Sequence, residues 1–162
     1  MTPGTTVPPH YHNRFSETFD LLRGSVTVYH TDQLDIELLE KSASSLAIGD
    51  PKTVEPGRYH QYSVGDEVTT MRVTLTPGDL DFERLLKILD GLARDGELEK
   101  HSADLVMMAV VMDLADAHLI GPAREMLDGV YATRGQEVYA RKEELLKTYD
   151  TDEALGRLIG DV

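Results

Sequence analysis

The hydrophobic pattern of the chain changes its period at Thr76-Pro77-Gly78. Upstream of this tripeptide, apolar residues occur in short segments separated by Gly, Pro, Asp and Asn, which is typical of β-structure. Downstream of it, apolar residues recur every three or four positions, as they do on one face of an α-helix. The sequence therefore predicts a mainly β domain over residues 1–78 and a helical C-terminal extension over residues 79–162.

Short strands dominate the predicted N-terminal domain. Turn-forming pairs such as Arg23-Gly24 and Gly49-Asp50 divide it into short runs. We expect strands over residues 18–22, 25–30, 34–39, 44–48, 59–64 and 68–75. Strands this short and this closely spaced favour a β-sandwich or a small barrel over a parallel α/β sheet.

The C-terminal extension is expected to form three to four helices. Phe82 and Leu85 lie on one apolar stripe of the first helix, which Asp95-Gly96 ends. Ser102 is the expected N-cap of a longer second helix that runs to about Ile120. The first helix is expected over residues 79–94, and the remaining helices over 122–133 and 136–148, with a last turn over 152–159.

Three histidines and one glutamate have the spacing of a metal site. His10 and His12 flank Tyr11, so both imidazoles point to one face if the tripeptide is extended. Glu17 follows five residues later, and His60 lies in a separate segment. Imidazoles combined with a carboxylate suit borderline divalent ions such as Fe, Mn, Ni and Zn. The sequence predicts one such ion and leaves its identity open.

The residues around this site resemble a known signature. The first signature of the cupin superfamily, G-x5-H-x-H-x4-E-x6-G, is matched without a gap by Gly4, His10, His12, Glu17 and Gly24. The segment Pro56-Gly57-x-x-His60 resembles the second cupin signature. Its spacing from Gly49 differs from that signature, and Ser63-Val64 stands where a closing Asn is expected. The resemblance covers about residues 4–76.

The cupin resemblance implies both a fold and a ligand set. It implies a double-stranded β-helix, which is a jelly-roll barrel, with one divalent metal ion inside it. The ligands that it implies are His10, His12, Glu17 and His60. The extension is also similar to the helical extension of many small bacterial cupins, through Phe82-Glu83 and the segment Gly91-Leu92-Ala93-Arg94-Asp95-Gly96. This second likeness implies nothing about chemistry.

Glu17 and Tyr62 are the candidate catalytic residues. A carboxylate can leave a metal and act as a base, and alternation places Tyr62 on the same face as His60. Its hydroxyl could donate a hydrogen bond to a developing oxyanion, whereas Tyr11 should face outward. We expect an enzyme that acts on a small organic molecule by dioxygenase-like or isomerase-like chemistry. The alternative is a non-catalytic cupin module that senses a metabolite or binds a metal.

The remaining histidines and arginines carry weaker signals. His30 and His101 are expected in solvent, and His118 is expected near the end of the second helix of the extension. Any of three arginines could orient an anionic substrate at the mouth of a barrel: Arg14, Arg58 and Arg72. The sequence leaves the directions of these side chains open.

The composition disfavours several kinds of partner. A net charge of −13, from 29 acidic and 16 basic residues, repels nucleic acids and anionic membranes. The apolar run over residues 105–112 is far shorter than the roughly 20 residues of a membrane span. The N-terminal segment has neither the charge nor the apolar core of a secretory signal. The absence of cysteine excludes disulfides and favours the cytoplasm. With nucleic acids and membranes disfavoured, the expected partner is a small-molecule ligand or substrate.

A homodimer is expected from the position of the metal motif. The motif begins at Gly4, whereas cupins usually have one or two strands before it. Those strands are expected to be absent or to be supplied by a partner. An exposed strand edge or the helical extension could then join two copies of the chain.

Overall fold

A computed structural model describes residues 1–101 and 103–160 of the chain. They form two compact units. The first unit contains Met1–Asp79 together with His118–Gly121, and the second contains the described residues of 80–117 and 122–162. The first unit therefore includes a short segment from within the region predicted as helical. The functional division into domains 1–78 and 79–162 stays a prediction.

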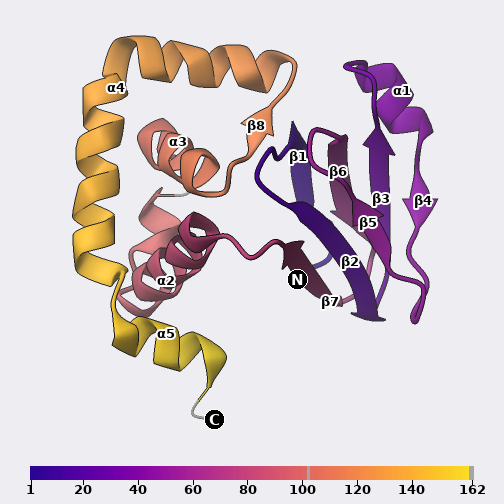
Figure 1. Cartoon of the computed structure of the whole chain (residues 1–162), viewed down its shortest axis with the longest axis horizontal. Coiled ribbons are helices and arrows are strands. Elements are labelled where there is room, and N and C mark those ends of the chain that lie inside the picture. The colour runs from indigo at the N-terminus through magenta and orange to yellow at the C-terminus, as the bar shows by residue number, and fades with distance from the viewer. Residues whose placement is uncertain (102, 161–162) are drawn as a thin grey trace. The chain divides into compact units, whose positions relative to one another are not determined.

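Two antiparallel sheets build the first unit (Figure 1). The larger sheet has the strand order β4-β3-β6-β1-β8, and the smaller sheet has the order β5-β2-β7. Among the described residues, no ladder of hydrogen bonds joins the two sheets into a closed barrel. The strands are β1 (Thr6–Tyr11), β2 (Ser16–Arg23), β3 (Val26–Thr31), β4 (Ser44–Ser45), β5 (Lys52–Val54), β6 (Tyr59–Val64), β7 (Thr70–Thr76) and β8 (His118–Leu119).

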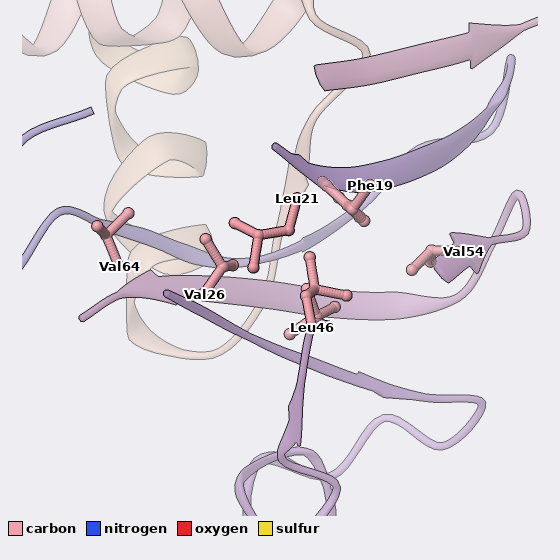
Figure 2. Packing of buried hydrophobic residues seen from close by; sticks show 7 residues of the cluster. Phe19, Leu21, Val26, Leu46, Val54 and Val64 are labelled. Atoms are coloured by element: carbon pink, nitrogen blue, oxygen red, sulfur yellow. The ribbon is translucent and has the colours of Figure 1, made fainter. Parts of the chain in front are cut away.

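Alternation along these strands supplies the apolar core. Phe19 and Leu21 are buried on β2, while the residues between and beside them are more exposed. Figure 2 shows their side chains with those of the neighbouring strands, gathered in the space between the ribbons. Burial of each large side chain contributes roughly 1.5–3 kcal/mol. The cluster consists of Phe19, Leu21, Val26, Val28, Leu46, Val54 and Val64.

The expected strand over residues 34–39 is wrong, because this segment forms helix α1 (Ile36–Lys41). Asp35 explains the difference, since its carboxylate accepts hydrogen bonds from the backbone N–H groups of Glu37 and Leu38. Such an N-cap satisfies donors that a new helix leaves unpaired. Leu39 is then buried, which anchors the helix.

The expected helix up to Ile120 is wrong at its C-terminal end. Helix α3 (Leu105–Leu114) stops earlier, and Asp116 adopts a positive φ of 50° that turns the chain. The next residues extend as β8 and pair with β1. The N–H of Ile120 also donates to the carbonyl of Pro9. Apolar periodicity in this stretch could not reveal a strand, because the partner strand is more than a hundred residues away.

Helices form the second unit. Helices α2 (Leu80–Arg94) and α5 (Asp152–Ile159) confirm the expected segments. The two segments expected over 122–133 and 136–148 form the single helix α4 (Pro122–Tyr149), which is kinked at Arg134. A 3-10 turn, η1 (Leu98–His101), follows α2. Asp104 caps α3, and the expected cap Ser102 lies outside the described residues.

Over the described residues, each helix is too short or too polar to cross a membrane.

Candidate metal centre

The structure brings together the four residues that the sequence singled out, His10, His12, Glu17 and His60. One ligand atom from each of them lies within 4.8 Å of those of the other three. All four side chains are buried, with exposed fractions between 2% and 7%. Polar groups are buried at this density only where they have partners, so the cluster is a built feature of the fold.

Backbone hydrogen bonds join the two sequence segments that carry the cluster. His10 on β1 lies opposite His60 on β6 in the antiparallel register. The N–H of Gly57 donates to the carbonyl of His12 at 2.7 Å, which ties the Pro-Gly turn to the His-x-His strand. Gly57 has a φ of 76°, a left-handed conformation that favours glycine. Glu17 approaches from β2, the central strand of the other sheet.

Backbone carbonyls fix the orientation of two of the imidazoles. Nδ1–H of His10 donates to the carbonyl of Pro8 at 2.7 Å, and Nδ1–H of His60 donates to the carbonyl of Arg58 at 3.0 Å. A carbonyl can only accept, so each Nδ1 carries the proton. The Nε2 atom of each neutral ring then directs a lone pair at the cluster. Metal-binding histidines usually have this arrangement.

The distances between the ligand atoms fit a shared cation. His10 Nε2 lies 3.1 Å from His12 Nε2, and Glu17 Oε2 lies 3.0 Å from His60 Nε2 and 3.4 Å from His12 Nε2. Ligands bound to one ion at about 2.1 Å are about 3.0 Å apart at a right angle and about 3.4 Å apart at a tetrahedral angle. Electron-rich atoms this close need a proton or a metal ion between them.

Burial and neighbouring charges shift the protonation of the cluster. Burial, with the nearby His60 and His12, lowers the pKa of His10 to about 3. Burial alone would raise the pKa of Glu17, but the neighbouring imidazoles of His12 and His60 outweigh it and lower the pKa to about 2. A neutral imidazole and an ionised carboxylate are the forms that bind a metal.

Tyr62 lies on the core side of β6, as expected. It packs against the apolar core, and its ring centroid is 5.9 Å from that of Phe19. Burial and the charge of Glu17 raise the pKa of Tyr62, which keeps its hydroxyl protonated as a donor. Tyr11 lies away from the cluster, where its ring stacks on His118 with centroids 4.8 Å apart.

The three candidate arginines each pair with a carboxylate. Arg14 binds Asp79 through two hydrogen bonds, Arg58 lies 3.0 Å from Asp32, and Arg72 pairs with Asp20. Each of these three arginines therefore has a carboxylate partner within the strand unit.

His30 is exposed, as the sequence analysis expected. It lies directly opposite His60 in the β3–β6 register, on the face that carries the buried Val28 and Val26. Its side chain is nevertheless exposed, because it lies at the end of the strand. It is not one of the four clustered ligands.

Known proteins give a fold likeness only. No protein-family model matches the sequence, and no curated protein matches it. KdgF from Halomonas sp. is 17% identical over 46% of this chain and 59% of its own, with a TM-score of 0.37. A double-stranded β-helix protein from Klebsiella pneumoniae is 17% identical over 46% and 55%, with a TM-score of 0.36. An oxalate oxidase is 18% identical over 90% and 59%, with a TM-score of 0.40.

The cupin resemblance therefore rests on the signature residues of the sequence. The three histidines and the glutamate of those signatures form the buried cluster. The chain spans 59% of KdgF and 59% of the oxalate oxidase.

Proposed function

We propose that the chain binds one divalent metal ion through His10, His12, Glu17 and His60. The observation that carries the proposal is the convergence of four buried ligand atoms, carried by strands of both sheets and by His12, the residue after β1. The carbonyl-oriented rings of His10 and His60 support it, because their free Nε2 atoms face the other ligands. Three nitrogens and one carboxylate oxygen suit Fe, Mn, Ni or Zn.

The chemistry that such a site supports is the activation of a small organic molecule. A bound divalent ion would polarise a substrate oxygen, and iron would also supply redox chemistry. Glu17 provides the only carboxylate of the cluster, so its free oxygen is the candidate base for a substrate proton. The Tyr62 hydroxyl would donate a hydrogen bond to an oxyanion that develops on the substrate.

The leading function is therefore a metal-dependent enzyme with dioxygenase-like or isomerase-like chemistry. The apolar surroundings of Tyr62 and Phe19 support a small organic substrate, because such sites combine apolar walls with few polar groups. The alternative is a metal-containing module that binds a metabolite without turnover. The buried ligand set is equally compatible with this second role.

Turnover assays distinguish the two functions. Protein reconstituted with Fe(II) is tested for oxygen consumption with diketones, thiols and catechols, and NMR follows isomerisation of the same compounds with each divalent ion. Turnover that disappears in Glu17→Gln and persists in the double variant His30→Ala, His118→Ala supports the enzyme. A ligand-induced rise in melting temperature without turnover supports the sensor.

We further propose that the chain acts as a homodimer in the cytoplasm. The cytoplasmic location follows from a sequence without cysteine and stays a prediction. The open strand edge of the smaller sheet supports the dimer.

A further inference from the structure

Strand β7 presents an incompletely covered apolar face. Met71, Val73 and Leu75 lie opposite the buried Leu21, Phe19 and Glu17 of β2, so they point toward the core side of the smaller sheet. Val73 is nevertheless 41% exposed, and Met71 and Leu75 are only partly buried. The core of the strand unit is therefore open along this strand.

The backbone edge of β7 is also open. Among the described residues, β2 is the only strand that pairs with Thr70–Thr76. The N-terminus of the chain pairs with Thr69, just before the strand begins. The edge carries no proline and one charged residue, Arg72, which pairs with Asp20 on the outer face. Natural edges usually carry charges or proline that prevent pairing, so this edge is suited to strand addition.

The sequence of β7, TMRVTLT, is self-complementary in the antiparallel direction. If two copies pair about Val73, Met71 of one copy lies opposite the partner's Leu75. The inner face of the joined strands is then apolar throughout, with Val73 opposite the partner's Val73. On the outer face, Arg72 lies opposite the partner's Thr74, so no like charges meet.

We propose that β7 pairs with β7 of a second copy of the chain, antiparallel and with Val73 on the two-fold axis. Pairing joins the two smaller sheets into one continuous sheet of the order β5-β2-β7-β7-β2-β5. It covers the exposed apolar residues of both copies and pairs their backbone edges. A register shifted by one residue would place Arg72 and threonines on the apolar face.

The pairing also shields one flank of the candidate metal centre. Leu75 is the cross-strand neighbour of Glu17, and it is one of the partly exposed residues that the second copy would cover. The dimer proposal rests on the geometry of β7 and not on a bound metal, so a failed dimer test leaves the metal proposal intact.

Cysteine cross-linking tests the register, because the chain has no cysteine of its own. In the proposed register, Val73→Cys places the thiols of the two copies opposite each other, at a separation that a disulfide can span. Mild oxidation is expected to cross-link Val73→Cys into a dimer of twice 18.0 kDa. Thr74→Cys, which points to the other face and lies opposite the partner's Arg72, is expected to stay monomeric in a denaturing gel. Equal cross-linking of both variants would overturn the proposed register.

Light scattering tests the dimer itself. The wild-type chain is expected at twice 18.0 kDa at micromolar concentration, and Val73→Lys at 18.0 kDa with an unchanged circular dichroism spectrum. Val68→Lys is the matched control, because Val68 is 61% exposed and precedes β7. This control is expected to stay dimeric. A monomeric wild-type chain, or a Val73→Lys variant that stays dimeric, would overturn the proposal.

Discussion

His60 Nε2 lies 3.0 Å from Glu17 Oε2, although the two residues are 43 positions apart in the sequence. His60 belongs to the larger sheet and Glu17 to the smaller one, so this contact joins the two sheets at the candidate metal centre. Nδ1–H of His60 already donates to a carbonyl, which leaves Nε2 of a neutral ring as an acceptor facing a carboxylate. A cation between the two atoms would turn this contact into a stabilising one.

Replacing Glu17 by glutamine tests the part of the carboxylate in the site. The variant keeps the size of the side chain but loses the negative charge that a divalent ion needs. We expect metal affinity to fall by at least the roughly 10–100-fold that loss of a supporting partner costs. Competition with a chromophoric chelator measures the change. Asp20→Asn, on the outer face of the same strand, is expected to keep wild-type affinity.

Replacing Tyr62 by phenylalanine separates metal binding from catalysis. Tyr62 belongs to β6 with His60 but is not one of the four clustered ligands. We expect Tyr62→Phe to retain its metal, while turnover falls by about 10²–10³-fold if the hydroxyl stabilises an oxyanion. Metal content and turnover are measured on the same preparation. Loss of metal from this variant would show that the assigned role is wrong.

Gly24, the last residue of the first signature, has a steric reason to be glycine. Its φ is 92°, and an added Cβ would lie 2.7 Å from Cα of Thr69. We expect Gly24→Ala to lower the free energy of unfolding by about 2–4 kcal/mol, through backbone strain and overpacking. Gly129→Ala is the control, because no heavy atom lies within 4 Å of its added Cβ inside α4. That change is expected to stabilise by about 0.5–1 kcal/mol in urea unfolding.

Asp150 predicts a pH dependence in the helical unit. Hydrogen bonds from Lys87 and Arg84 hold the pKa of Asp150 below its ordinary value, despite partial burial. A lowered pKa stabilises the fold above the unfolded-state pKa of about 3.9, and this contribution is lost as the pH falls through the folded-state pKa. Asp150→Asn is therefore expected to be less stable than wild type at pH 7, with a difference that shrinks as the pH falls below about 4.

Urea unfolding of both proteins across this pH range measures the difference. The control is Asp128→Asn, since the Asp128 side chain is 68% exposed and its ion pair with Arg124 is 3.5 Å long. Exposed pairs contribute little, so this variant is expected to match wild type at every pH. A constant gap between wild type and Asp150→Asn would show that the ion pairs of Asp150 do not cause it.

Local patterns predicted most of the individual elements. Strand β6 and helix α5 have the expected bounds, because alternation and capping are encoded within a few residues. The local pattern over residues 34–39 predicted a strand wrongly, because its apolar residues fit a strand as well as a helix. The capping carboxylate of Asp35 decided the outcome.

Long-range pairing could not be read from local patterns. The strand β8 and the place of His118 beside Tyr11 depend on a partner 107 positions away in the sequence. The candidate ligands could be predicted from the sequence because their spacing is itself a signature. The register of His30 with His60 could be seen only in the paired sheet. The open flank of β7 likewise emerged only from the three-dimensional burial of Val73.

Metal analysis of protein purified without a histidine tag tests the central claim most directly. Plasma mass spectrometry is expected to find about one divalent ion per chain in the wild-type protein, and almost none in the double variant His10→Ala, His60→Ala. The matched control, His30→Ala with His118→Ala, removes two exposed histidines and is expected to keep the ion. A wild-type protein with little metal, at a content that the loss of His10 and His60 does not change, would contradict the account.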